Sequence, residues 1–438
     1  MKPGDTITVC AESLSRHGDG VAQHEGREVH VAGLLPGETG EVKLDYVSRQ
    51  RMRAHGTVIE RRNAHPGRRQ APCRHHGRCN GCAVMDMDVA SQRELKVAQL
   101  SKRHGFEVDR IVATDDDGLH YRWSVKRVFA GKPGALVLGS FMRGTHNVAD
   151  MEGCLVDHPD IIAACDELLT VANDAGAAAY DELDESGDLR YAWFKTDGRG
   201  NVLVAIVTAD PLATMAHGIA ERLERPAGIA WGVHSGRGND MRGVTIRPLR
   251  GRQTLAIELC GELVHIGPQG FLQPNPTTAA LAYHDLVRVP AGGFPHGRVA
   301  LDLYAGAGIT TNLLRERFEV VVPCESYPES ARALGIKAEL VEEFLAPILA
   351  DPHHPHRSPD LVIANPPRGG LGADVCNQLN ALAAPRLHIM SCSPASLHED
   401  LQHLTGDDGA YKLIAMRAFD TLPQTAHIEL VAWLVGKG

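Results

Sequence analysis

Short apolar runs that alternate with polar positions fill the first 60 residues, and a period of two is typical of β-strands. Turns that contain glycine or proline separate these runs, at residues 18–20 and 35–38. The predicted strands occupy residues 6–9, 29–32, 40–44 and 55–59. Short strands at this spacing favour a five-stranded barrel of the oligonucleotide-binding (OB) type over residues 1–62.

The next 200 residues mix strand and helix periods. A connector rich in cysteine, histidine and arginine, residues 61–95, leads into a helix. Beyond it the pattern predicts a helix at 161–175, a hairpin turn at 198–201, and strands at 125–129, 135–139 and 202–207. We therefore predict a central α+β domain over residues 63–262.

From residue 263 onward, short apolar strands alternate with helical segments, which is typical of a parallel, doubly wound sheet. The predicted strands lie at 300–303, 320–322, 361–364 and 387–390, and an antiparallel pair at 411–419 and 427–435 closes the chain. Residues 263–438 thus form the third domain of a multidomain α/β protein. The closing pair resembles that of class I (Rossmann-like) methyltransferases.

The composition is that of a globular protein with no membrane segment. The chain has 438 residues, 43% of them hydrophobic, and its start, residues 1–5, has no apolar signal segment. A cytoplasmic location is the expectation. The net charge is −9, yet residues 41–80 hold ten Lys or Arg against three Asp or Glu. This stretch is either a footprint for a phosphate backbone or simply a solvated charged face.

A cluster of cysteines marks a candidate metal site. Cys73, Cys79 and Cys82 follow a C-x5-C-x2-C spacing, and Cys154 could become a fourth ligand on folding. In a reducing compartment, thiolates this close would repel one another unless a metal neutralised them. Zinc, with help from the histidines at 75–76, an iron–sulfur cluster, and reduced unligated thiols all remain open. Isolated cysteines are predicted to be buried small hydrophobes: Cys10, Cys165, Cys260, Cys324 and Cys376.

A nucleotide-binding turn is predicted after the first strand of the third domain. Gly306 and Gly308 lie between that strand and a helix, where glycines allow a ligand to approach the backbone closely. Glu325 ends the next strand, 19 residues after Gly306, where an acid can accept hydrogen bonds from ribose hydroxyls. The run 365–368, Asn-Pro-Pro-Arg, ends a later strand at the same edge of the sheet.

Cys392 and Glu429 form a candidate catalytic pair at that edge. A thiolate can add to carbon 6 of a pyrimidine and make carbon 5 nucleophilic enough to take a methyl group from a sulfonium. A base must then remove the proton from carbon 5, and Glu429 could do so. Taken singly, Cys392 could equally be a buried thiol and Glu429 a surface acid.

The ordered set of these motifs resembles the RNA uracil-5-methyltransferases that use S-adenosylmethionine, specifically the 23S rRNA branch. Residues 18–38 are similar to a TRAM domain, an RNA-binding module. The family's cysteine spacing matches Cys73, Cys79, Cys82 and Cys154, which implies a 4Fe–4S cluster rather than zinc. The resemblance also implies an RNA partner (23S rRNA favoured, tRNA possible), no membrane association and a monomer.

The resemblance assigns roles in the third domain residue by residue. The family's nucleophile motif falls on Cys392, and its base motif falls on residues 423–429 with Glu429 as the base. Its cofactor motifs fall on residues 271–275 and on the run from Asp302 to Gly308. The positions it assigns to S-adenosylmethionine are Gln273, Tyr304, Gly306, Gly308, Glu325 and Asn365.

The chain departs from the family pattern at four places. Asn365 replaces an aspartate, Ser393 replaces the asparagine after the nucleophile, and Ile309 replaces an asparagine after the glycine turn. The span from 325 to 365 is short, so the loop on the adenine side is expected to be trimmed, with Glu342 as the best candidate for its acid. These changes put the affinity for the cofactor and the rate in question more than the reaction type.

Two other functions remain open from the sequence. The Asn-Pro-Pro run at 365–367 is similar to that of amino-group methyltransferases, although those enzymes carry an aromatic residue where Arg368 stands and need neither Cys392 nor Glu429. The departures also allow a catalytically weak RNA-binding protein.

Overall fold

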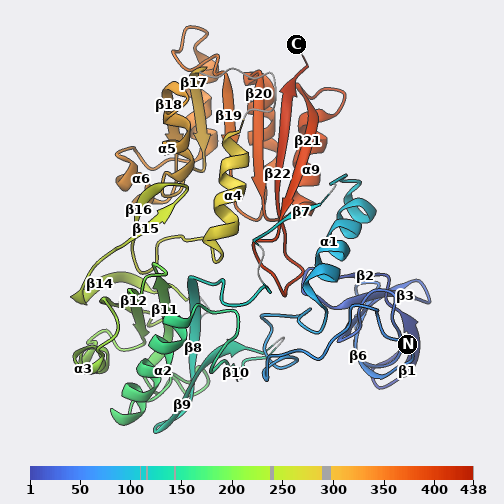
Figure 1. The fold of residues 1–438 in the computed structure, drawn as a ribbon, viewed down its shortest axis with the longest axis vertical. Helices are drawn as coiled ribbons and strands as arrows, with labels where there is room; N and C mark the ends of the chain where they lie inside the picture. Colours follow the sequence, from blue (N-terminus) through green and yellow to red (C-terminus); the bar gives the residue numbers. More distant parts are fainter. Residues whose placement is uncertain (109, 115–116, 143–144, 237–240, 289–296, 438) are drawn as a thin grey trace.

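The structure is a computed structural model that describes residues 1–108, 110–114, 117–142, 145–236, 241–288 and 297–437. Three bodies can be distinguished, each built on its own main sheet (Figure 1). The C-terminal body lies at one end of the molecule, and the other two lie side by side beneath it.

The N-terminal sheet has the strand order β1-β5-β6-β4-β3-β2. Its strands are β1 (Thr6–Cys10), β2 (Ser13–Leu14), β3 (Gly20–His24), β4 (Arg27–Ala32), β5 (Thr39–Val47) and β6 (Arg53–Arg61). All four strands predicted here are present; β2 and β3 were missed because the glycines at 18 and 20 indicated only a turn. The described chain thus has six strands in this sheet, and the five-stranded barrel stays a prediction.

One cysteine prediction is wrong in this sheet. Cys10 is exposed, not buried. Burial alternates along β1, so Val9 points into the core and Cys10 points outward. The other isolated cysteines are buried or partly buried.

The central sheet has the order β10-β9-β8-β11-β12-β13-β14. Its elements are β8 (Ser124–Lys132), β9 (Ala135–Phe141), β10 (Val148–Asp150), α2 (Pro159–Asp174), β11 (Leu189–Thr196), β12 (Val202–Thr208), α3 (Thr214–Arg222), β13 (Gly228–Val233) and β14 (Val244–Gly251). Apolar side chains of α2 and α3 share one core with β11 and β12, which are buried along their whole length. The predicted helix, hairpin turn and strands are confirmed.

The C-terminal sheet has the order β18-β17-β19-β20-β22-β21-β7. Its strands are β7 (Ile111–Val112), β17 (Gly297–Leu303), β18 (Phe318–Cys324), β19 (Leu361–Ala364), β20 (Arg386–Ser391), β21 (Tyr411–Phe419) and β22 (Glu429–Gly436). The helices around it are α4 (Pro276–Val287), α5 (Ile309–Arg315), α6 (Pro328–Leu334), α7 (Val341–Ala350), α8 (Gly372–Leu382) and α9 (Pro394–Thr405). Strands β18, β17, β19 and β20 are parallel and β21–β22 is the predicted antiparallel pair.

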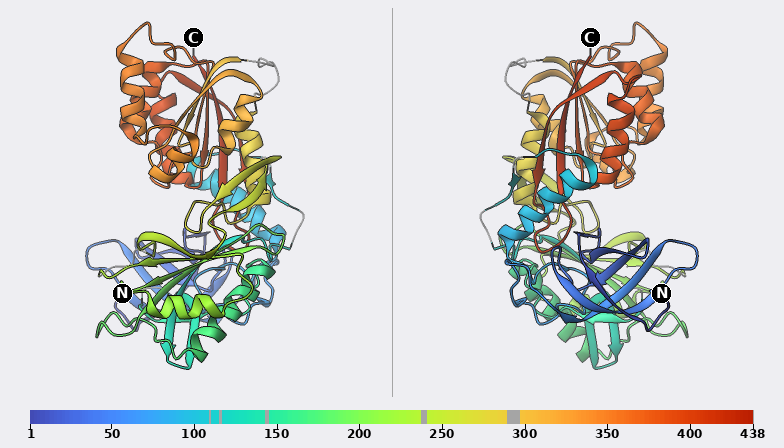
Figure 2. Two further views of the ribbon diagram at one scale, coloured as in Figure 1. Left: turned by 90° about the vertical axis from the view of Figure 1, so that its left-hand side faces the viewer. Right: turned by 90° about the vertical axis from the view of Figure 1, so that its right-hand side faces the viewer.

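Two segments cross the predicted domain boundaries. Helix α1 (Val89–His104) and strand β7 fall within residues 63–262, yet β7 extends the C-terminal sheet and Leu100 of α1 lies in that sheet's core. The hairpin of β15 (Leu255–Leu259) and β16 (Glu262–Ile266) packs with α4 and α5. Figure 2 shows α1 passing between the C-terminal body and the two others.

The parallel strands of the C-terminal sheet all end on the same side of the sheet. These carboxyl ends face the other two bodies in Figure 1. In open α/β sheets, ligands bind outside the carboxyl ends of the strands. No helix in the described part of the chain is both long and apolar enough to cross a membrane.

Candidate active site

The structure brings Cys392 and Glu429 together across two neighbouring strands. Ser391 of β20 pairs with Leu430 of β22 in antiparallel register, so the next position along places Cys392 opposite Glu429. Side chains at directly opposed positions lie within contact distance. Glu429 is only 4% exposed, whereas Cys392 is partly exposed to the space beyond the sheet edge.

Burial favours the protonated form of both groups, and the Glu429 carboxylate adds to the effect on Cys392. Burial raises the pKa of the Glu429 carboxyl to about 8. Burial, and then the nearby Glu429 carboxylate, raise the pKa of the Cys392 thiol. The Arg368 guanidinium opposes both shifts, since its positive charge attracts both anions. A cation at this position therefore favours the reactive, ionised form of either group.

Arg368 is a candidate functional residue to which the sequence analysis gave no role. It ends the Asn-Pro-Pro-Arg run after β19, and its backbone carbonyl accepts a hydrogen bond from Ser396 Oγ at 2.9 Å, which fixes the turn beside α9. The available signal was its place at the end of a strand at the same edge as Cys392 and Glu429.

The glycine turn between β17 and α5 offers an open backbone surface. Gly306 has φ 57° and Gly308 φ 84°, the left-handed region that glycine adopts without strain. A β-carbon at Gly306 would meet no described atom within 4 Å, whereas at Gly308 it would lie 2.5 Å from a methyl group of Leu334. Gly306 thus leaves room for a ligand, while Gly308 allows the turn to pack against α6.

Asp302 stabilises this turn through hydrogen bonds to the helix that follows it. It is buried, and its carboxylate accepts hydrogen bonds from Thr310 Oγ1 at 2.9 Å and Thr311 Oγ1 at 2.6 Å. Burial raises its pKa to about 6, against the lowering effect of the two hydroxyls. Asp302 therefore ties the end of β17 to the first turn of α5.

Glu325 lies directly beside the open glycine. Its carboxylate accepts the backbone N–H of Gly306 at 2.8 Å and that of Tyr327 at 2.6 Å. Tyr304 is held at φ 62°, a conformation unusual for a non-glycine residue, and the carboxylate of Glu342 helps burial to raise the pKa of its phenol. An open backbone, an acid and an aromatic ring fit the ribose and base of an adenosine ligand.

Gln273 joins the two halves of the site through a residue that the sequence did not single out. Its side chain lies near the phenol of Tyr283, a buried residue of α4 whose pKa is raised by burial and then by the Glu429 carboxylate. Asn275 instead caps α4, because its Oδ1 accepts the N–H of Thr278 at 3.1 Å. The neighbouring Phe271 is 60% exposed.

The departures from the family pattern have structural roles. Ser393 caps α9, since its Oγ accepts the N–H of Ser396 at 3.3 Å. Ile309 is buried at the start of α5. Asn365 is partly buried and its N–H donates to the carbonyl of Leu303 at 3.2 Å. The span from 325 to 365 contains helices α6 and α7, an irregular stretch at 351–360 and strand β19, and β18 is one of the two edge strands of the described sheet.

The four clustered cysteines line a single small cavity in the central body, far from Cys392 in sequence. Cys73, Cys79, Cys82 and Cys154 share its wall with apolar groups such as Met85. Burial raises the pKa of Cys82 to about 12 and that of Cys154 to about 11, and the neighbouring thiols add to the effect on Cys82. Among the described residues, no three Cys, His, Asp or Glu side chains converge on a point that could hold one metal ion.

The predicted basic stretch is partly neutralised by acids. Five of its ten cations form ion pairs, which are Arg53–Glu28, Arg61–Glu38, Arg62–Glu41, Arg68–Glu38 and Arg74–Glu152. Lys43, Arg49, Arg51 and Arg78 are exposed. The unpaired part of this surface is thus smaller than the count of charges indicates.

Relatives among curated proteins span the whole chain. An uncharacterized RNA methyltransferase of Geobacter sulfurreducens is 29% identical over 464 residues, which cover 100% of this chain and 91% of that protein. An uncharacterized RNA methyltransferase of Parasynechococcus marenigrum is 28% identical over 452 residues, covering 99% and 96%. No protein-family model matches the chain.

Among solved structures, a tRNA (uracil-54, C5)-methyltransferase of Pyrococcus abyssi, in complex with S-adenosyl-L-homocysteine, is similar over 98% of this chain and 99% of its own. The TM-score is 0.75 at 21% sequence identity. A likeness of this extent establishes the fold: a multidomain α/β protein with a class I methyltransferase fold.

Proposed function

We propose that this protein transfers a methyl group from S-adenosylmethionine to carbon 5 of a uridine in RNA. The observation that carries the proposal is the placement of Cys392 opposite Glu429, with Arg368 beside both. Support comes also from relatives named as RNA methyltransferases and from the structural likeness to a uracil-C5 enzyme. An amino-group methyltransferase needs neither the thiol nor the buried acid.

The residues divide the reaction into steps. Arg368 favours the thiolate of Cys392, which adds to carbon 6 of the uracil and makes carbon 5 nucleophilic. When bound, S-adenosylmethionine supplies the electrophilic methyl group that carbon 5 takes. Glu429, ionised, then removes the proton from carbon 5. The electron pair of that C–H bond re-forms the C5–C6 double bond, and the carbon–sulfur bond breaks to release Cys392.

We assign the cofactor site to the opening above Gly306. Glu325 would accept hydrogen bonds from the ribose hydroxyls, Tyr304 and Gln273 would border the ligand, and Asn365 would face it from the end of β19. Gly308 contributes by packing the turn against α6 rather than by touching the ligand.

We further propose that Cys73, Cys79, Cys82 and Cys154 hold a 4Fe–4S cluster. The donor set is four thiols, which suits such a cluster. The four thiols line one cavity, as the ligands of a single cluster must. The N-terminal sheet would contact RNA through exposed Tyr46 and its neighbouring arginines.

Two classes of RNA are candidate substrates, 23S rRNA and tRNA. The sequence resemblance favours 23S rRNA, whereas the similar solved structure is of an enzyme named as a tRNA methyltransferase. Both RNAs, transcribed without modification, serve as probes.

The test is methylation of these transcripts by the purified protein with radiolabelled S-adenosylmethionine, followed by nucleoside analysis. We expect 5-methyluridine from the wild type and from Cys10→Ala, a control that removes an exposed cysteine of the N-terminal sheet. Cys392→Ala should yield none. Methylated cytidine or adenosine that persists in Cys392→Ala would establish the amino-group reaction instead.

A further inference from the structure

The loop of residues 420–428, which joins β21 to β22 and leads directly into Glu429, has a conformation that it cannot hold alone. Gln424 is 0% exposed and has φ 66°. A non-glycine residue occupies this left-handed region only where the surrounding structure fixes it. The groups that fix this loop come from segments that precede it by about 300 residues in the sequence.

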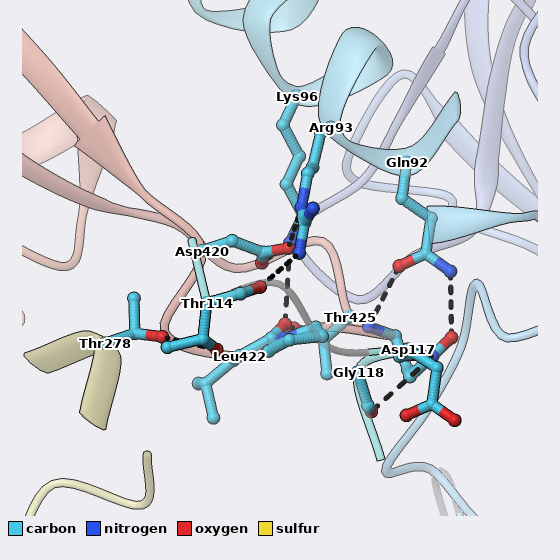
Figure 3. A network of polar contacts seen from close by, with 12 residues as sticks. Gln92, Arg93, Lys96, Thr114, Asp117, Gly118, Thr278, Asp420, Leu422 and Thr425 are labelled. Carbon is cyan, nitrogen blue, oxygen red and sulfur yellow. Dashed lines mark hydrogen bonds and ion pairs between the residues drawn. The ribbon is translucent and has the colours of Figure 1, made fainter. Parts of the chain in front are cut away.

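The first contact is a reciprocal pair of amides between α1 and the loop. The backbone N–H of Gln424 donates to Gln92 Oε1 at 2.9 Å, and Gln92 Nε2 donates to Gln424 Oε1 at 2.8 Å. Gln424 Nε2 in turn donates to the carbonyl of Asp117 at 3.0 Å. Figure 3 shows Gln92 projecting from α1 toward the loop beside Asp117 and Gly118. A β-carbon at Gly118 would lie 2.7 Å from Pro423, so the segments are in close contact.

The second contact is a buried ion pair at the start of the loop. Lys96 Nζ lies 2.6 Å from the Asp420 carboxylate and donates to the carbonyl of Leu422 at 3.4 Å, while Arg93 reaches the other Asp420 oxygen at 3.3 Å. Lys96 is 6% exposed and Asp420 0%. In Figure 3 both cations descend from α1 onto the loop. Removing Asp420 would leave the buried ammonium of Lys96 uncompensated, so this pair anchors the loop.

The third contact is with the apolar cluster that adjoins the cysteine cavity and shares Met85 with its wall. Tyr121 Oη donates to the carbonyl of Pro423 at 3.0 Å, and the N–H of Val84 donates to the carbonyl of Gln424 at 3.2 Å. Leu422 packs into the same apolar cluster as Tyr121 and Met85. That cluster also contains three of the four clustered cysteines, Cys73, Cys82 and Cys154. The loop is therefore held between α1 on one side and the cavity wall on the other.

We infer that Gln92, Tyr121 and Gln424 are positioning residues that set the place of Glu429 by holding its loop against the cysteine cavity. The inference rests on the proposed function and gives the cavity a structural role, because its folded wall helps to support the catalytic base. Thiol addition and methyl transfer need Cys392 but not Glu429. A displaced loop should therefore slow the removal of the proton from carbon 5 and spare the earlier steps.

The experiment follows the covalent RNA complex with ordinary uridine RNA, quenched in denaturant and resolved on a gel. Tyr121→Phe removes only the hydroxyl, and Gln424→Gly removes the amide while it tolerates a positive φ. We expect release to slow on the order of 10–100-fold in both variants, with accumulation of the complex. The control is Tyr411→Phe, which removes another buried, doubly hydrogen-bonded hydroxyl from the far end of β21 and should release RNA like the wild type.

Two results would overturn the inference. The first is release of RNA at the wild-type rate in both variants. The second is a decrease in the rate of complex formation as large as the decrease in the rate of release. A wild type that forms neither complex nor 5-methyluridine would instead refute the proposed function. Hydrogen exchange supplies a readout without activity: amides of residues 420–428 should exchange faster in Tyr121→Phe and in Cys79→Ser than in the wild type. Unchanged exchange in Cys79→Ser would contradict the link to the cavity.

Discussion

Replacement of Glu429 by glutamine should stabilise the protein at alkaline pH. The pKa of this carboxyl is raised from 4.5 to about 8 by complete burial. Below pH 4.5 the carboxyl is protonated in both the folded and unfolded states. Between pH 4.5 and 8 the folded state keeps a proton that the unfolded state has released, so the free energy of unfolding falls as pH rises. Each pKa unit is worth about 1.4 kcal/mol, which sets an upper bound of about 5 kcal/mol on the total loss.

Glutamine has nearly the same shape but no charge to bury, so Glu429→Gln escapes this loss. The assay is thermal unfolding of both proteins from pH 5 to pH 9, with the difference in Tm plotted against pH so that the titration of other groups cancels. We expect the advantage of Glu429→Gln to grow up to about pH 8 and then to level off. A difference in Tm that does not vary with pH would show that Glu429 is not a high-pKa group, and the account of its environment would fail.

Three further changes test other parts of the site. Arg368→Met should raise the pKa of Cys392 and of Glu429, because Arg368 lowers both. The rise of the reaction rate with pH should therefore shift to a higher pH by about half to one unit. A pH–rate profile that does not shift would exclude this role of Arg368. Glu325→Gln should weaken binding of S-adenosylmethionine about tenfold by calorimetry, and unchanged affinity would contradict the assignment. Anaerobically purified wild type should be brown and Cys79→Ser should be paler, whereas a colourless, zinc-loaded wild type would rule out the iron–sulfur proposal.

Local patterns were enough to predict most strands and the class of the C-terminal fold. The strands predicted from the alternation in residues 6–9 and from the apolar runs at 361–364 and 387–390 are confirmed. They were predictable because a strand buried on one face alternates apolar and polar residues, and a strand buried on both faces is apolar throughout. The glycine turn was predictable for a different reason, since a positive φ such as that of Gly306 strongly favours glycine.

Contacts between distant segments were not predictable in this way. The sequence pattern did not indicate that α1 packs on the C-terminal sheet or that β7 pairs with it. The pattern of an amphipathic helix shows which of its faces is buried, but it does not identify the element that covers this face. Tyr283 was missed because a tyrosine on an apolar helix face usually belongs to the core. The exposure of Cys10 was missed because the residue type alone, in a lone cysteine, does not show which face of the strand it occupies.

The central claim is a covalent bond between Cys392 and a uracil, and one measurement tests it directly. The wild-type protein, S-adenosylmethionine and an RNA that contains 5-fluorouridine should form a complex that survives denaturation, because fluorine at carbon 5 cannot be removed as a proton. Mass spectrometry of the digested complex should place a methylated fluorouridine nucleotide on the peptide that contains Cys392. If no stable complex forms, or if the nucleotide is attached to another residue, the proposed reaction is wrong.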